Sequence, residues 1–302
     1  MKESMAQKIL LTTLGRCPAC GNQARKQVIA IKDTAVYECS SCTLRYIDPC
    51  LSLESMENAY ESDETLTSLH SFHEGYYDYG SLACESKTSR DYKKALRLIE
   101  ASRLDKKNLS IFDVGAGNGF FLAIAKERGW RVAGIDSSPK NVELAKRKFN
   151  VDLICTNFAF YKKNEHKFDV ISFWDVIEHL PDPNSAIQKA KEMLSPNGQL
   201  LIGVPNDQSL LRRLSILIHR VTFGWVKKGL DKVYFLEHVA YFNLRSLTGL
   251  MRRHGLERTG YFYTSTDLNR FSFKVSEKLI AHTVVTLGKL TGLQNRLVAV
   301  FK

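Results

Sequence analysis

The stretch IFDVGAGNGFF, residues 111–121, decides the fold of this 302-residue chain. It begins as a compact apolar run, passes through a loop with three glycines, and ends where further apolar residues begin a helical pattern. Glycines let a backbone pass close beneath a ligand, and the N-terminus of a helix offers free N–H groups to it. The motif therefore predicts a strand, a ligand-binding loop and a helix in direct succession.

Strand and helix patterns alternate on both sides of this motif. Apolar runs predict strands at residues 109–116, 131–136, 151–157, 168–177 and 199–206. Apolar residues at helical spacing, with capping and stop residues at the ends, predict helices at residues 91–104, 119–129, 138–149 and 185–198. Such alternation indicates an α/β fold, in which a doubly wound, mainly parallel sheet carries helices on both faces.

Two carboxylates stand where a nucleoside would need them. Asp113 lies two residues before Gly115, and Asp136 ends the second predicted strand. A carboxylate at that strand tip can accept hydrogen bonds from the hydroxyls of a ribose. Both an NAD site and an S-adenosylmethionine site would use it. A dinucleotide site usually reads G-x-G-x-x-G, whereas here the third glycine comes one residue early, at Gly119.

Four of the seven cysteines form two C-x2-C pairs near the N-terminus: Cys17, Cys20, Cys39 and Cys42. Two such turns can present four thiolates at the corners of a tetrahedron around Zn²⁺, and they leave no open position for catalysis. In a reducing cytoplasm, metal binding is favoured over disulfides. The spacing predicts a structural zinc module with strands at residues 28–31 and 35–37; a redox pair or plain buried cysteines are the alternatives.

Three segments carry a resemblance to a known family: DVGAGNGFF (113–121), GID (134–136) and FDVISFWDVIEHLPDP (168–183). They resemble motifs of class I S-adenosylmethionine-dependent methyltransferases, particularly the group related to ubiquinone-biosynthesis O-methyltransferases. The resemblance covers about residues 90–265, including HVAYFNLRSLTGLMRRHGLERTGY (238–261). It implies a Rossmann-like doubly wound sheet and S-adenosylmethionine as cofactor, and it says little about the substrate.

The resemblance also implies which residues bind the cofactor. The glycine loop would lie against the methionine part of the cofactor: Gly115, Ala116, Gly117, Asn118 and Gly119. Asp113 would orient that loop or bind the amino group. Asp136, with Ser137 beside it, would hold the ribose hydroxyls.

Three further positions would complete the cofactor pocket. Asn157, after the third strand, stands where an Asp often reads the adenine amino group, and an Asn can accept that bond through its carbonyl oxygen. Trp174 and Asp175 follow the fourth strand, where the family lines the pocket. Packing in the core is the alternative for Trp174.

The candidate catalytic residues follow the fourth and fifth strands. Asp175, Glu178 and His179 share a face if the chain turns helical there, and two carboxylates with an imidazole can bind a divalent cation. A similar E-x-x-E-H set is associated with a metal ion in the ubiquinone O-methyltransferases, although Asp175 is shorter than Glu. His238 resembles a His that faces the acceptor in this family. For Glu178, His179 and His238, roles in proton transfer or metal binding compete with structural roles.

An extra segment separates the fifth strand from His238. Residues 210–221 carry an apolar stripe at helical spacing, with basic side chains mostly off it. Residues 207–302 hold 16 Lys/Arg against 6 Asp/Glu, whereas residues 1–206 hold 27 against 26, so nearly all of the net charge of +11 lies in the last third. A basic amphipathic helix can lie on a membrane, cover a substrate or pack on the core. We expect peripheral membrane contact through residues 208–230, with the other two roles as alternatives.

The expected organisation has four parts: a zinc-ribbon module (1–47), a linker and cap (48–90), a methyltransferase domain (91–272, with an insertion at about 208–236) and a C-terminal helical segment (273–302). Aromatic residues of the cap are expected to close over the acceptor or to pack in the core: Tyr76, Tyr77 and Tyr79. A signal peptide and a membrane-spanning run of roughly 18 apolar residues are both missing from the sequence, so we expect a cytoplasmic protein.

The expected activity is methyl transfer to a small molecule, a glycan precursor or a lipid-linked intermediate. The basic last third leaves RNA methylation as an alternative. The fourth strand, however, lacks the [DN]-P-P-[YF] signature with which many base methyltransferases stack a flipped base, so nucleic acid is the less favoured partner. A binding module that retains the fold without catalysis is a further alternative, disfavoured by the intact glycine loop and Asp136.

Overall fold

The computed structural model describes residues 10–31, 33–52, 55, 81–83, 85–102, 108–162, 165–222, 233–234, 236–266 and 275–302. Tyr76, Tyr77 and Tyr79 lie outside these residues, as does much of the predicted insertion after residue 222. Across the described part of the chain, no helix is long and apolar enough to cross a membrane.

A seven-stranded sheet forms the centre of the molecule, in the order β12-β13-β10-β9-β6-β7-β8. Its strands are β6 (Ser110–Val114), β7 (Arg131–Asp136), β8 (Ile154–Cys155), β9 (Phe168–Trp174), β10 (Leu194–Pro205), β12 (Arg258–Thr264) and β13 (Arg296–Phe301). The pairs from β8 through β10 are parallel, and β13 runs antiparallel to both β10 and β12. The predicted doubly wound α/β fold is confirmed.

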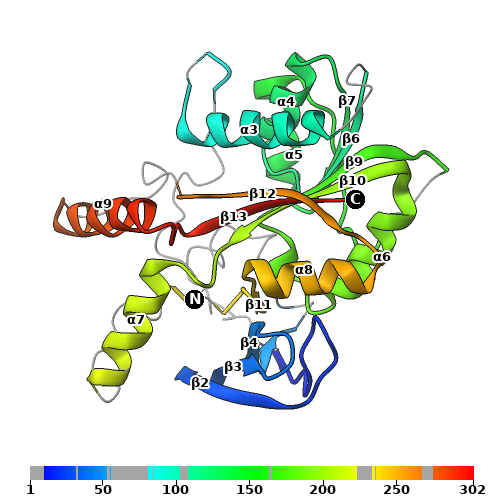
Figure 1. The fold of residues 1–302 in the computed structure, drawn as a ribbon. Coiled ribbons are helices and arrows are strands. Elements are labelled where there is room, and N and C mark those ends of the chain that lie inside the picture. Colours follow the sequence, from blue (N-terminus) through cyan, green and yellow to red (C-terminus); the bar gives the residue numbers. More distant parts are fainter. Residues whose placement is uncertain are drawn as a thin grey trace, which may run out of the picture.

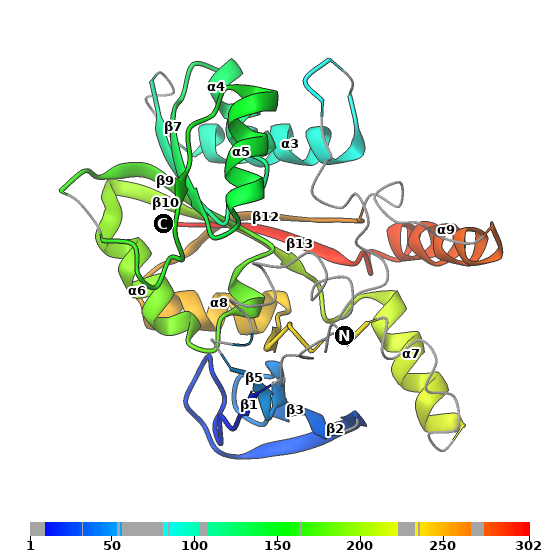
Figure 2. The same ribbon diagram turned by 180° about the vertical axis from the view of Figure 1, so that it is seen from behind.

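Helices cover both faces of this sheet (Figures 1 and 2). One face carries α3 (Lys87–Ala101), α4 (Phe120–Glu127) and α5 (Pro139–Phe149), and the other carries α6 (Pro183–Met193) and α8 (Leu244–Arg253). Side-chain caps begin several of them: the Asp182 carboxylate accepts from Ser185 N, and the Asn243 side chain accepts from Ser246 N. Such caps satisfy N–H groups that the first turn leaves without helical partners.

The C-terminal segment differs from the prediction of an all-helical tail. Helix α9 (Val275–Leu290) is present, but residues 296–301 form β13 inside the central sheet. The run Leu297–Phe301 is fully buried, which suits a strand covered on both faces better than the end of a surface helix. The third strand is also shorter than predicted, because only Ile154–Cys155 pair with β7.

The N-terminal residues form a small β module. It contains β1 (Leu11–Thr12) paired with β5 (Cys50–Leu51), and a sheet of β2 (Arg25–Ile31), β3 (Thr34–Cys39) and β4 (Arg45–Asp48). A fourth strand of that sheet, β11 (Ala240–Tyr241), comes from the segment after the insertion. The module therefore extends past the predicted boundary at residue 47 and shares a sheet with the larger domain.

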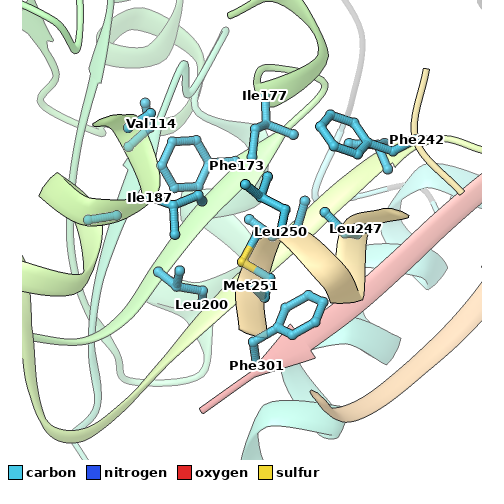
Figure 3. Packing of buried hydrophobic residues seen from close by; sticks show 14 of the residues in the cluster. Val114, Phe173, Ile177, Ile187, Leu200, Phe242, Leu247, Leu250, Met251 and Phe301 are labelled. Atoms are coloured by element: carbon cyan, nitrogen blue, oxygen red, sulfur yellow. The ribbon is translucent and has the colours of Figure 1, made fainter. Parts of the chain in front are cut away.

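One hydrophobic core joins the module to the larger domain. Figure 3 shows side chains of the sheet, α6 and α8 meeting on one face, among them Phe173, Ile187 and Leu250. Buried residues of the module, including Leu44 and Tyr46, belong to the same cluster. Burial of such side chains stabilises the fold by roughly 1.5–3 kcal/mol each, so a shared core fixes the two parts against each other.

The predicted helix after the fifth strand is α7 (Leu210–Val221). It points away from the sheet, as does α9 (Figures 1 and 2). The buried residues of α7 are Arg212 and Ile216. In its apolar stripe, Leu210 and Leu214 are half-buried, whereas Leu217 is 55% exposed and Val221 64%. The stripe is therefore only partly packed on the rest of the protein.

Candidate functional site

The glycine loop between β6 and α4 has the backbone that the sequence predicted. Gly115, Gly117 and Gly119 have φ values of 67°, 56° and 77°, a region that favours glycine. A Cβ at Gly115 would lie 2.5 Å from Val176 Cγ2, and one at Gly119 would lie 2.9 Å from Ala145 Cβ. At Gly117, by contrast, no atom of the described residues lies within 4 Å of such a Cβ. The outer glycines permit close packing, and the middle one borders open space.

Asp136 ties the end of β7 to this loop. Its carboxylate accepts hydrogen bonds from Gly117 N (2.8 Å), Ser138 N (2.9 Å) and Asn141 Nδ2 (3.0 Å). Burial raises the pKa of Asp136, and the three donors act in the opposite direction. Ser137 is half-buried beside it. The carboxylate thus lies next to the open space above Gly117, where a ribose would have to bind.

Asp113 points into the sheet instead of into that space. It is 1% exposed and accepts a hydrogen bond of 2.6 Å from Ser172 Oγ of the neighbouring strand β9. Burial raises its pKa to about 8. Of the two predicted roles, this geometry fits orientation of the loop and does not fit contact with a ligand's amino group.

Two other loop residues are also engaged locally. Asn118 is buried, and its side-chain oxygen accepts from Phe120 N (3.2 Å), at the start of α4. Ala116 N donates to Ile135 O (2.9 Å) of β7. These contacts leave the backbone of the loop, more than its side chains, to face a ligand.

Trp174 and Asn157 have local partners as well. The Trp174 ring lies 4.7 Å from Tyr92 and 5.2 Å from Phe121, and a Cβ at Gly203 would overlap it at 2.3 Å. Trp174 therefore packs in the core on the α3 side of the sheet, and it is also among the residues that line a small pocket with Thr264. The Asn157 side-chain oxygen, predicted to read adenine, accepts from Ala159 N at 2.9 Å.

Asp175 does not join the predicted cation set. It adopts a φ of 54°, and Arg296 Nη2 donates to both of its carboxylate oxygens at 2.8 and 2.9 Å. Its backbone N donates to Gly203 O (2.9 Å). The prediction that Asp175, Glu178 and His179 together bind a cation is wrong in its first member, because the left-handed backbone and Arg296 turn that carboxylate elsewhere.

His238 takes the third place instead. One potential ligand atom each from Glu178, His179 and His238 lies within 4.8 Å of the others. Glu178 and His179 lie on a short 3-10 turn (Ile177–His179) after β9, and His238 comes from the segment before β11. The two imidazole rings are 4.6 Å apart and nearly perpendicular. The structure thus brings together the three candidate catalytic residues, from segments about 60 residues apart.

The electrostatics of this cluster are unusual. Glu178 is 1% exposed, and neither of its oxygens has a hydrogen-bond partner among the residues that the structure describes. Burial, and then the charge of Asp175, raise its pKa well above the usual value. A buried acceptor without a donor costs roughly 1–3 kcal/mol. The arrangement fits a carboxyl group that binds a ligand, either a cation or a proton donor.

His179 is held in one orientation within the cluster. Its Nδ1 lies 2.9 Å from the carbonyl oxygen of Glu237, so Nδ1 carries the hydrogen and Nε2 of the neutral ring is the acceptor. Burial lowers the pKa of His179, which keeps the ring neutral near pH 7. A neutral imidazole with a defined acceptor nitrogen can take up a proton or bind a metal ion.

The four predicted zinc ligands also meet. The Sγ atoms of Cys17, Cys20, Cys39 and Cys42 all lie within 4.8 Å of one another. The separations are 3.5 Å between Cys17 and Cys42 and 3.4 Å between Cys20 and Cys39, far too long for disulfides. Zn–S bonds of about 2.3 Å would place tetrahedral sulfur atoms about 3.8 Å apart. The donor set therefore fits a structural Zn²⁺.

Sequence reasoning missed two charged groups. Arg296 holds Asp175 from a strand 121 residues away. Asp207, next to the end of β10, is buried between Arg45 of the module and Arg212 of α7. No local sequence pattern marks Arg296 or Asp207, because their partners are distant in the sequence and come close only in the folded chain.

The curated relatives include ubiquinone biosynthesis O-methyltransferases. The protein from Coxiella burnetii is 26% identical over 139 residues, which are 44% of this chain and 59% of that protein. The one from Rickettsia canadensis is 25% identical over 219 residues, covering 71% of this chain and 89% of that protein. The chain thus spans about three fifths of the length of the Coxiella burnetii protein.

A solved structure shows the same fold. The plantazolicin methyltransferase BpumL in complex with SAH is 18% identical, with a TM-score of 0.52 over 82% of this chain and 93% of that one. A family model described as "Methyltransferase domain" matches residues 86–259, more than half of the chain. With the class I fold and the glycine loop described above, that match shows that the chain belongs to this methyltransferase family.

Proposed function

We propose that this protein transfers a methyl group from S-adenosylmethionine to a small molecule, a glycan precursor or a lipid-linked intermediate. The observation that carries the proposal is the open space above Gly117, bordered by Asp136. The turn that carries Glu178 and His179 begins directly beyond Val176, which packs on Gly115 of the same loop. A cofactor site and a cluster of acid–base groups thus follow adjacent strands of the sheet.

The chemistry asks little of the protein beyond alignment. The sulfonium donor already has a good leaving group, so the acceptor atom must be held in line with the methyl group, and a hydroxyl or protonated amine acceptor must also lose a proton. Bond formation to the acceptor accompanies cleavage of the carbon–sulfur bond. His179 Nε2 and His238 are suited to take the acceptor proton, with Glu178 as a hydrogen-bond partner of the acceptor.

A divalent cation is a second way to use the same three residues. One carboxylate and two imidazoles form a ligand set that transition metals accept. The buried oxygens of Glu178 support this proposal. A bound cation would favour the ionised form of an acceptor hydroxyl. Neither RNA methylation nor a purely binding role gains support from the site geometry or from the relatives named above.

The cofactor assignment predicts a loss of affinity when Asp136 is replaced. Asp136→Ala removes a charge-assisted hydrogen bond worth about 1.5–3 kcal/mol, so the dissociation constant of S-adenosylmethionine should rise roughly tenfold to a hundredfold. Isothermal calorimetry measures it. The matched control is Asp152→Ala, whose carboxylate is 81% exposed and pairs with the exposed Lys146. Equal affinities for both variants would contradict the assignment.

The catalytic assignment is tested with a search for the acceptor. Wild-type protein, S-adenosylmethionine and fractionated cell extracts should yield a product that has gained one methyl group, detected by mass spectrometry. Glu178→Gln and His238→Ala should lower the rate by roughly 10²–10⁴, the usual contribution of acid–base groups, with cofactor affinity retained. Undiminished rates in both variants would remove this cluster from the mechanism. Repeating the assay with EDTA and then with added Mg²⁺ or Mn²⁺ separates cation binding from direct proton transfer.

The zinc assignment predicts one metal ion per chain. Elemental analysis of protein purified under reducing conditions should find about one Zn²⁺ in the wild type and in Cys155→Ser, whose thiol is exposed and distant in sequence. Cys17→Ser and Cys42→Ser should lose the metal and unfold the N-terminal module, because about 40 residues bury little core without it. Metal-free wild-type protein would refute the assignment.

Peripheral membrane contact is proposed for α7, with α9 beside it. Eight of the fourteen exposed large hydrophobic side chains in the described part of the chain lie on these two helices. The exposed charged side chains of α7, Arg213 and Arg220, are both basic, which favours an anionic lipid surface over a second copy of the same positive surface.

Vesicle co-sedimentation tests this contact. Anionic vesicles should bind the protein more strongly than neutral ones, and added salt should weaken the binding. Leu217→Glu together with Val221→Glu should abolish it. Phe160→Glu is the matched control, because Phe160 is 71% exposed but follows β8 at the opposite end of the sheet order. Negligible binding of the wild type under all conditions would leave α7 as a cover for the acceptor or as a packed helix.

A further inference from the structure

The segment that carries His238 is built on the cysteine module. Two residues after His238, Ala240 begins β11, in which Ala240 and Tyr241 pair antiparallel with Tyr46 and Arg45 of β4. Ile47 N also donates a hydrogen bond of 2.9 Å to Val239 O. The backbone next to this histidine is therefore the edge strand of the module's own sheet.

The same segment orients the second histidine. The carbonyl oxygen of Glu237 accepts the hydrogen bond from His179 Nδ1, and the His238 ring packs edge-on against the His179 ring. Both imidazoles thus depend on the position of residues 237–241. A shift of β4 would move His238 directly and would withdraw the carbonyl that fixes His179.

Arg45 connects the module to the end of the fifth strand. From β4, its guanidinium donates to Glu38 at 2.9 Å and lies 3.2 Å from the buried carboxylate of Asp207. Asp207 N donates to Phe242 O at 2.9 Å, immediately after β11. Through Asp207, Arg45 therefore helps to fix the position of Phe242, the residue that follows β11.

The metal-binding turns are themselves anchored on the larger domain. Asn184 Nδ2 donates to Pro18 O (2.6 Å), Arg253 Nη1 to Cys20 O (3.3 Å) and Asn243 Nδ2 to Thr43 O (3.3 Å). These contacts come from α6, the end of α8 and its N-cap. Together with the shared core, they hold the module in one orientation. A module that served only to bind a separate partner would need none of these contacts.

We infer that the cysteine module is a structural part of the acceptor side of the active site, and that Arg45 is a positioning residue for His179 and His238. The inference rests on the proposed function, which gives these histidines their role. The metal ion holds the two cysteine turns, β4 follows the second turn, and β4 carries the edge strand beside His238. Zinc occupancy and methyl transfer are thereby coupled through backbone pairing.

Hydrogen exchange of the full-length, zinc-loaded protein tests this inference. Arg45→Met should raise the exchange rate of amides in residues 236–242 roughly tenfold or more, because local opening of β11 becomes easier. Arg45→Lys should restore part of the protection, since a lysine can still pair with Asp207. Glu38→Gln is the matched control, because it removes the half-exposed partner of Arg45 and leaves the Asp207 contact in place. The dissociation constant of S-adenosylmethionine and the zinc content should stay within twofold of wild type.

The imidazole proton resonances of His179 and His238, followed by NMR, supply a second readout. Arg45→Met should shift them, and Glu38→Gln should leave them in place. The inference would be overturned if amides in residues 236–242 of Arg45→Met exchanged at the same rate as in the wild type. An equal rise across residues 110–136, which would mean general loss of stability, would overturn it too. These measurements need no methyl acceptor. The proposed function would fail separately, if the wild-type protein did not bind S-adenosylmethionine.

Discussion

The contact between Gly115 and Val176 is the constraint on which the site depends. A Cβ at Gly115 would come within 2.5 Å of Val176 Cγ2, so the glycine loop and the turn after β9 meet with no room for a side chain at this position. That turn then delivers Glu178 and His179 two and three residues later. Because the contact is this close, the position of the glycine loop and that of the turn with Glu178 and His179 are set by the same packing.

Residues from distant strands hold the turn after β9 in place. Asp175, immediately before Val176, has a left-handed backbone that is unfavourable for a residue with a Cβ. Its carboxylate is bound by Arg296 from β13, and its N–H by Gly203 of β10. The last strand of the chain therefore helps to shape the turn that follows the fourth strand of the sheet.

The cysteine module supports the segment that carries His238. Its sheet accepts β11 as an edge strand, and its core continues into that of the larger domain. A small β module of this length gains stability from such shared packing, because it buries little core by itself. His238 consequently depends on the edge of the module, whereas His179 depends both on the turn after β9 and on the Glu237 carbonyl beside that edge.

The sequence by itself determined the class of fold, the glycine loop, Asp136 and the four-cysteine set. These are local patterns: apolar runs mark strands, glycines mark positions with positive φ, and paired cysteines mark turns. The tertiary structure decided what distant residues do. It turned Asp175 toward Arg296, placed His238 beside His179, exposed part of the stripe of α7 and inserted residues 296–301 into the sheet. The physical reason is that pairing and burial depend on contacts between residues far apart in the chain, which no local pattern records.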